Sequence, residues 1–164
     1  MERAGDTAVP MMREVLGSVA AREVPQGTAP ETAASFRRIP VTVNDRGPVG
    51  GIAGSGLHAD RVSLGTQFSA SRCRRPLERY SVSRGQDVSF CFRAVHRRVE
   101  ESVRVHWLKD GRLVRRSTLP IPPIHAYRTR ARLALRREYV GSWRAVALSE
   151  DGVELAQARF EVIE

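Results

Sequence analysis

Apolar and polar residues alternate along much of the chain after residue 59, and this pattern predicts strands. In residues 87–95 the apolar side chains occupy every second position, as they do in a strand with one buried face. Residues 127–135 alternate in the same way, and residues 61–69 are expected to form the first strand. Burial of Val88, Phe90 and Phe92 stabilises a fold by about 2 kcal/mol each. Cys91 lies between the two phenylalanines and is therefore expected on the opposite face.

Two Asp-Gly pairs predict β-hairpins. Asp110-Gly111 separates two alternating runs within residues 102–120, and Asp151-Gly152 does the same within residues 141–163. Such pairs are a strong hairpin signal because a tight turn needs residues that tolerate positive φ. A two-residue turn in the second hairpin sets these residues opposite each other: Trp143 and Phe160, Ala145 and Ala158, Ala147 and Ala156. Residues 120–124 are expected to be a stiff connection, because their prolines cannot donate to a sheet ladder.

These elements together predict an all-β fold, an immunoglobulin-like antiparallel sandwich of two sheets with about seven strands. The sandwich is expected over residues 59–164. Its predicted core consists of Phe90, Phe92, Val105, Trp107, Leu133, Trp143, Phe160 and Val162. The inter-sheet disulfide of antibody domains is excluded, because the later strand carries no cysteine.

Residues 1–58 are expected to be a largely disordered tail or linker. Residues 11–23 have apolar side chains at helical spacing, which fits either a short amphipathic helix docked on another surface or a frayed tail; translation could instead begin at Met11 or Met12. Residues 25–59 are rich in Gly, Pro, Ala, Thr and Ser without sustained periodicity, as linkers are. The glycine-rich stretch 47–56 lacks the strand-loop-helix context of a phosphate-binding loop, so a linker is the preferred interpretation.

The net charge of +9 comes entirely from the later part of the chain. Residues 1–59 carry six arginines and six acidic residues, whereas residues 60–164 carry 21 basic and 12 acidic residues. A basic surface attracts nucleic acid, anionic lipid or an acidic protein. Lys109 is the only lysine, so an arginine-rich genome is the preferred explanation of this charge.

Two motifs follow each other in the last hundred residues: W-x-x-D-G from Trp107, and the ending G-x-W…D-G-x-x-L…F-x-V from Gly141 to Val162. With them, the chain over about residues 61–164 resembles the bacterial domain of unknown function 2914. The resemblance implies a C-terminal all-β module of bacterial proteins, often appended to other segments, with no catalytic residues to carry over. The chain departs from the family pattern at residues 127–130, which lack a second aromatic residue, and at Arg75, where an acidic residue is expected before Pro76.

The sequence shows no arrangement typical of a catalytic or metal site. The histidines, His58, His96, His106 and His125, lack metal-ligand spacing, and the cysteines form no C-x-x-C pair. We therefore expect no catalytic residue, no metal, no cofactor and no enzymatic activity. No run of about 18 apolar residues predicts a transmembrane helix. No secretory signal is recognised, so Cys73 and Cys91 are expected to be free thiols in a cytoplasmic protein.

Arginines on the outward face of residues 127–135 are the strongest candidates for a binding site. Arg128, Arg130 and Arg132 alternate with apolar residues, and Arg136 and Arg137 extend the row. Such groups face either solvent or an anionic partner. Charged strands also discourage aggregation, and no aromatic residues for base stacking are interleaved with these arginines. The leading hypothesis is a non-enzymatic binding or scaffolding module for another protein; the alternative is nucleic acid or another polyanion bound by the arginine row.

Overall fold

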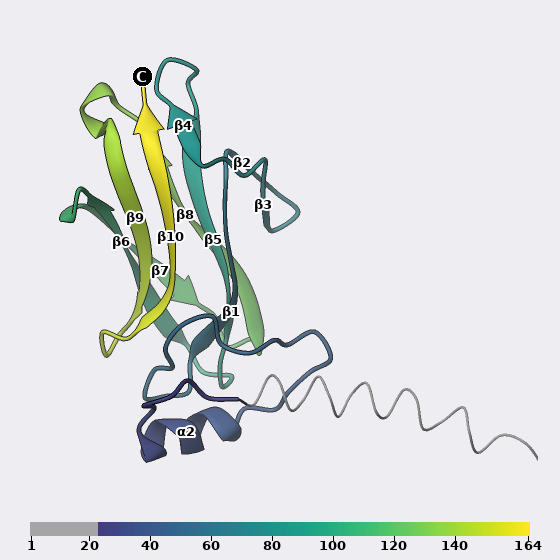
Figure 1. Ribbon diagram of the computed structural model, residues 1–164. Coiled ribbons are helices and arrows are strands. Elements are labelled where there is room, and N and C mark those ends of the chain that lie inside the picture. The colour runs from purple at the N-terminus through teal and green to yellow at the C-terminus, as the bar shows by residue number, and fades with distance from the viewer. Residues whose placement is uncertain (1–22) are drawn as a thin grey trace, which may run out of the picture.

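The computed structural model describes residues 23–164, and its strands form a sandwich of two main sheets. One layer has three strands in the order β1-β5-β8, namely β1 (His58–Gly65), β5 (Asp87–Val95) and β8 (Ala126–Ala134). The other has five strands in the order β4-β10-β9-β6-β7. These are β4 (Arg79–Ser81), β6 (Glu101–Lys109), β7 (Arg112–Ile121), β9 (Gly141–Ser149) and β10 (Glu154–Ile163). Figure 1 shows the two layers face to face, as the sequence predicted.

Aromatic rings bridge the two sheets at the centre of the core. The ring of Phe90 on β5 meets that of Trp107 on β6, with centroids 6.3 Å apart, and Trp107 meets Phe160 on β10 at 6.1 Å. Phe160 also stacks on Trp143 at 6.0 Å. Offset and edge-to-face rings add to the free energy gained by burial. All eight residues predicted for the core are buried, with exposed fractions of 4% or less.

Both hairpins turn at their Asp-Gly pairs, but the second lacks the predicted two-residue turn, because residues 150–153 separate its strands and a bulge follows between Glu154 and Ala156. Asp110 and Gly111 adopt positive φ angles of 49° and 81°, and Gly152 adopts 81°. β9 and β10 pair in the predicted register. Trp143 lies opposite Phe160, Ala145 opposite Ala158, and Ala147 opposite Ala156. β5 has the predicted bounds, and its residues from Val88 to Val95 are buried on both faces of the strand.

The structure differs from the prediction at the first strand. β1 ends at Gly65, and a separate hairpin follows, made by β2 (Gln67–Ser69) and β3 (Arg72–Arg74). A Cβ at Gly65 would lie 2.4 Å from the Arg74 carbonyl oxygen, so β1 ends where the returning strand β3 passes too close for any residue but glycine. The antiparallel prediction is also wrong for one pair, because β4 runs parallel to β10.

The linker interpretation is wrong for residues 30–57. Helix α2 (Pro30–Arg37) lies at the end of the sandwich opposite the C-terminus (Figure 1). The residues that follow bury Ile39, Ile52 and Leu57. A Cβ at Gly50 would lie 2.5 Å from a backbone oxygen of β10, so the glycine-rich stretch allows close backbone contact. The helix predicted at 11–23 falls, except for its last residue, outside the described residues.

Candidate anion-binding face

The alternation of β8 directs three of the five candidate arginines onto the outer face of the three-stranded sheet. Arg128 is half-buried, and Arg130 and Arg132 are exposed, while the apolar residues between them turn toward the core. Arg136 and Arg137 are exposed beyond the end of β8, where the short helix η1 (Arg137–Tyr139) begins. The five predicted arginines therefore form two groups: three lie on the outer face of the sheet, and two lie beyond the end of β8.

The candidate arginines on and beside β8 differ in the groups that they touch. Arg132 forms an ion pair with Asp87, with Nε 2.9 Å from Oδ2. The guanidinium of Arg130 lies 4.4 Å above the ring centroid of Phe68 from β2. Arg136 lies 3.9 Å from the carboxylate of a neighbouring glutamate. Exposed ion pairs contribute at most about 1 kcal/mol, so these arginines can exchange their partners for an external anion at little cost.

Strand register sets three arginines side by side across the sheet. Arg61 of β1 is the partner of Arg93 of β5, which in turn is the partner of Arg128 of β8. Like charges directly opposite each other destabilise a sheet. Burial, followed by the charges of Arg72 on β3, Arg61 and Arg93, holds the pKa of Arg128 below its usual value. Arg61 and Arg72 were not predicted, because only the pairing of β1 with β5 and of β3 with β2 brings them to this face.

Arg93 is the member of this row that carboxylates neutralise. Its Nη2 lies 3.1 Å from Oδ1 of Asp45, and its Nη1 donates to Oδ2 of Asp60. Arg61 also donates to Asp60 at 3.2 Å, and Nε2 of His125 lies 2.7 Å from Asp45. The Arg93 side chain is only 9% exposed. This buried ionic cluster joins the segment before β1 to β5, the central strand of the three-stranded sheet.

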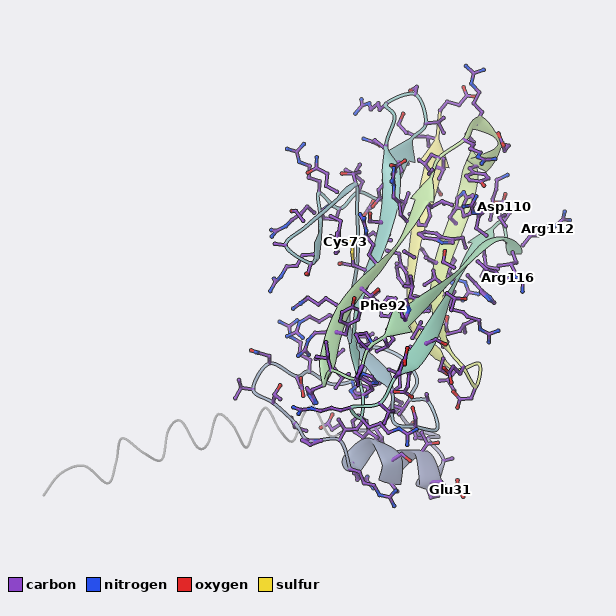
Figure 2. The ribbon with its side chains drawn as sticks, turned by 180° about the vertical axis from the view of Figure 1, so that it is seen from behind. Glu31, Cys73, Phe92, Asp110, Arg112 and Arg116 are labelled. Atoms are coloured by element: carbon purple, nitrogen blue, oxygen red, sulfur yellow. A yellow bond between two sulfur atoms is a disulfide. The ribbon has the colours of Figure 1, made fainter. Side chains whose placement is uncertain are left out.

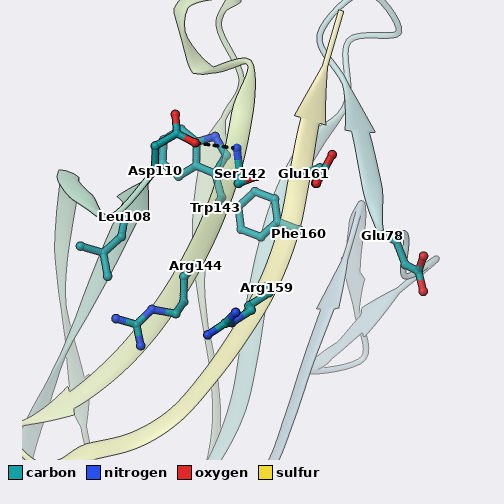
Figure 3. Close-up of a pocket in the computed structure, with 10 residues that line it drawn as sticks. Glu78, Leu108, Asp110, Ser142, Trp143, Arg144, Arg159, Phe160 and Glu161 are labelled. Carbon is teal, nitrogen blue, oxygen red and sulfur yellow. Dashed lines mark hydrogen bonds between the residues drawn. The ribbon is translucent and has the colours of Figure 1, made fainter.

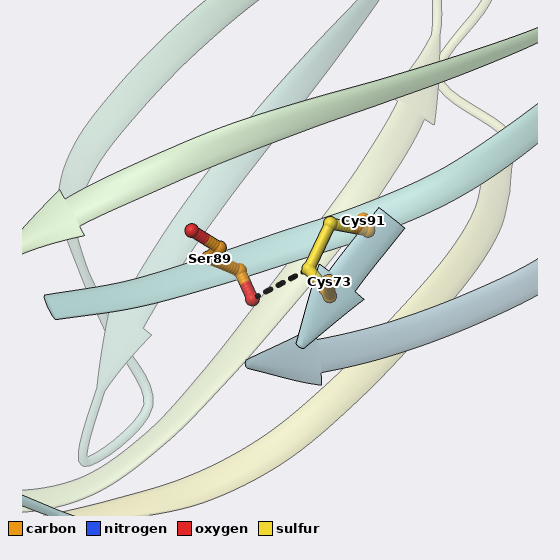
Figure 4. Close-up of a disulfide and its surroundings, with 3 residues drawn as sticks. All are labelled: Cys73, Ser89 and Cys91. Atoms are coloured by element: carbon orange, nitrogen blue, oxygen red, sulfur yellow. Dashed lines mark hydrogen bonds between the residues drawn. A yellow bond between two sulfur atoms is a disulfide. The ribbon is translucent and has the colours of Figure 1, made fainter. Parts of the chain in front are cut away.

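Cys73 and Cys91 form a disulfide, so the prediction of free thiols is wrong. The alternation correctly placed Cys91 on the outer face of β5, and the β2–β3 hairpin folds over that face and brings the two Cα atoms to 5.9 Å. Figure 4 shows the bridge, with Sγ of Cys73 3.4 Å from the Ser89 carbonyl oxygen. The hairpin escaped prediction because its turn, Ala70-Ser71, takes positive φ without the usual glycine or asparagine. The support that free thiols gave to a cytoplasmic location is removed.

Loss of the disulfide is expected to lower the free energy of unfolding by about 3 kcal/mol, because the bridge closes a loop between cysteines 18 positions apart. Denaturant unfolding of the wild type with and without reductant, beside the C73S/C91S double variant, measures this loss. Reductant should lower the midpoint of the wild type to that of the variant and leave the variant unchanged. If reductant leaves the unfolding midpoint of the wild type unchanged, the result would contradict the disulfide.

Three of the four histidines contact neighbouring groups of the fold. His58 donates from Nδ1 to a backbone carbonyl oxygen 2.9 Å away and packs against Phe36 of α2, with ring centroids 4.8 Å apart. Nδ1 of His96 lies 2.7 Å from the carboxylate of Glu101. His125 belongs to the ionic cluster around Arg93, and the fourth histidine lies on β6. Among residues 23–164, no group of three or more His, Cys, Asp and Glu side chains is arranged to hold a metal ion.

The free energy of unfolding is expected to fall as the pH is lowered from neutrality, first because of the titration of His58 and then because of the titration of Asp45. Burial lowers the pKa of His58, so below about pH 6.5 the unfolded chain takes up a proton that the folded chain resists. Burial raises the pKa of Asp45, but bonds from Thr42 and His125 outweigh this effect and lower it, so its contribution is lost below about pH 4.

Melting temperatures across this pH range measure both losses of stability. In the variant His58→Gln, the fall in melting temperature at the higher pH should become smaller. A His58→Gln profile that stays parallel to the wild type between about pH 7 and pH 5 would contradict the role of His58.

A hollow of about 590 Å³ lies on the outer face of the five-stranded sheet. Figure 3 shows Arg144 and Arg159 side by side there, and Glu78 and Glu161 also line the hollow. Arg144 donates to a further glutamate at 3.3 Å. No histidine, cysteine or lysine lines this hollow, and its charges of both signs are interleaved. With three acidic and two basic residues in its lining, it offers no surplus of positive charge.

The strand order β1-β5-β8 against β10-β9-β6-β7, with a buried tryptophan on β6, defines an immunoglobulin-like sandwich. Residues 100–162 match the family model described as "Protein of unknown function (DUF2914)", which confirms the resemblance over this C-terminal segment. The structure is also similar to the crystal structure of an immunoglobulin-like protein from Pseudomonas aeruginosa, with 16% identity and a TM-score of 0.46, over 65% of this chain and 96% of that one. No curated protein matches the chain. Among residues 23–164, no helix is both long and apolar enough to span a bilayer.

Proposed function

We propose that the protein is a non-enzymatic binding module that recognises an acidic partner protein through its arginine face. The arginine face is the outer surface of the three-stranded sheet together with the β2–β3 hairpin, and it carries Arg61, Arg72, Arg128, Arg130 and Arg132. The observation that carries the proposal is the unbalanced charge: Arg72 and Arg128 have no carboxylate partner among residues 23–164. Acidic side chains from a partner would supply the missing counter-charges.

The aromatic residues favour a protein over single-stranded nucleic acid. No Phe, Tyr or Trp side chain of the described residues is classed as exposed, and the one beneath the arginine face, Phe68, is covered by Arg130. Sequence-tolerant binding of single strands uses exposed rings on which bases stack. The disulfide supports the non-enzymatic part, because it leaves neither Cys73 nor Cys91 as a thiol nucleophile.

The disulfide also bears on where the module acts. Disulfides persist in oxidising compartments and are rare in the cytosol. We therefore propose an oxidising compartment in place of the cytoplasmic location expected from the sequence.

Fluorescence anisotropy with polyglutamate, a single-stranded oligonucleotide and a duplex tests the binding proposal over a salt series. The variant R128Q/R130Q/R132Q removes three charges from the arginine face, and R112Q/R115Q/R116Q removes three from the exposed edge strand β7. Figure 2 shows Arg112 and Arg116 away from the side that holds Cys73, so the second variant is a matched control. We expect polyglutamate affinity to fall at least about tenfold in the first variant and to change little in the second.

Equal losses in the two variants would show attraction by net charge alone and would overturn the assignment to this face. Binding of the oligonucleotides in preference to polyglutamate, with the same variant sensitivity, would replace the acidic protein by a polyanion. Activity of the purified protein on any substrate would overturn the non-enzymatic part.

A further inference from the structure

A pocket of about 400 Å³ lies within the arginine face, between the outer surface of the three-stranded sheet and the β2–β3 hairpin. Four arginines from four separate segments line it: Arg46 from the segment before β1, Arg61 from β1, Arg72 from β3 and Arg128 from β8. Asp60 is the only acidic residue among its lining residues, and the disulfide forms part of its wall. The β2–β3 hairpin thus converts a flat row of arginines into a concave basic site.

The single carboxylate of the pocket is bound through one oxygen only, because Oδ1 of Asp60 is buried without a hydrogen-bond partner. Asp60 is 2% exposed, and its Oδ2 accepts from Arg61, from Arg93 and from the backbone of Arg46. The side chains of Arg46, Arg72 and Arg128 have no carboxylate partner among residues 23–164. Three positive charges therefore converge on a hollow with nothing to balance them.

We propose that this pocket binds a small molecule through its phosphate or sulfate group. The inference rests on the proposed binding role of the arginine face and names a ligand class for one part of it. A guanidinium presents a planar fork of donors that matches such oxyanions, and several forks from different directions suit a tetrahedral group with more than one charge. The pocket falls within the range of roughly 300–1,000 Å³ found for small-molecule sites, so it has room for more than a bare ion.

The disulfide holds one of these arginines in position. Arg72 precedes Cys73 on β3, and the hairpin that carries both consists of two three-residue strands. Such a short hairpin is not stable alone in water. Reduction of the bridge frees the hairpin from β5, moves Arg72 away from the other arginines and so weakens binding of the anion.

Titration of the full chain with inorganic phosphate, sulfate and glycerol phosphate, at constant ionic strength with chloride, tests the inference. Calorimetry gives the affinity, and the Nε–Hε resonances of the arginines report the site. The variant R72Q/R128Q is compared with R112Q/R115Q, which removes the same charge from β7. Loss of two charged hydrogen-bonding groups is expected to weaken binding by at least about tenfold, whereas the control should stay near the wild type. Reductant should weaken anion binding by the wild type. It should not change anion binding by C73S/C91S, which is already weak without reductant.

Tighter binding of glycerol phosphate than of inorganic phosphate supports an esterified ligand, and the reverse order supports the free ion. Equal weakening in the two arginine variants, or no saturable binding of any of the three anions, overturns the pocket. Unchanged affinity after reduction overturns the role of the disulfide. Absence of phosphate binding together with polyglutamate binding that depends on Arg130 and Arg132 would remove the pocket and leave the proposed function standing.

Discussion

Replacement of Arg93 by methionine is expected to destabilise the fold by about 3–5 kcal/mol, which is typical of a buried ion cluster that loses one member. The reason is the carboxylates left behind. Asp45 and Asp60 are 8% and 2% exposed, and both bind the Arg93 guanidinium. Without it, two buried negative charges lie near each other with less compensation. Denaturant unfolding monitored by tryptophan fluorescence measures the loss.

The triple variant R93M/D45N/D60N separates this cause from poor packing. Neutral amides in place of the carboxylates remove the uncompensated charge, so the triple variant should recover much of the stability lost in Arg93→Met. A triple variant less stable than the single one would show that the cluster contributes more than charge balance. If the free energy of unfolding of Arg93→Met lies within about 0.5 kcal/mol of the wild-type value, the result would contradict a stabilising role of the ionic cluster.

Replacement of Trp107 by alanine is expected to cost about 3–5 kcal/mol, as for other large aromatic residues in cores. Its side chain is fully buried, and its ring contacts Phe90 from one sheet and Phe160 from the other. The cavity would lie between the layers, where neither sheet can close it alone. Leu113→Ala on β7 is the control, since Leu113 is 42% exposed. Similar losses in the two variants would contradict a core centred on Trp107.

The parts of the fold that the sequence predicted are those with strong local signals. Alternation placed β5 and β8 and turned Arg128, Arg130 and Arg132 outward, and the Asp-Gly turns set both long hairpins in register. The β2–β3 hairpin carries no such signal, because its turn uses Ala70-Ser71. Missing that hairpin also hid the disulfide, since Cys73 meets Cys91 only when the hairpin folds back over β5.

The segment before β1 was misjudged for a different reason. Few large apolar residues mark it, and much of its attachment is polar or through the backbone. Gly51 donates from its backbone to the Glu154 carbonyl oxygen at 2.8 Å, and Asp45 reaches Arg93 across 48 positions of sequence. Long-range contacts of this kind leave no periodicity in the chain. The same limit applies to the candidate site, where Arg61 and Arg72 join Arg128 only through strand pairing.

The most direct test of the arginine face is a map of amide chemical shifts as polyglutamate is added to the full chain. The account predicts that the shifted amides cluster on β1, β3 and β8, around Arg61, Arg72 and Arg128, with little change on β7. Shifts concentrated on β6, β7, β9 or β10, or no saturable shift at low salt, would contradict it.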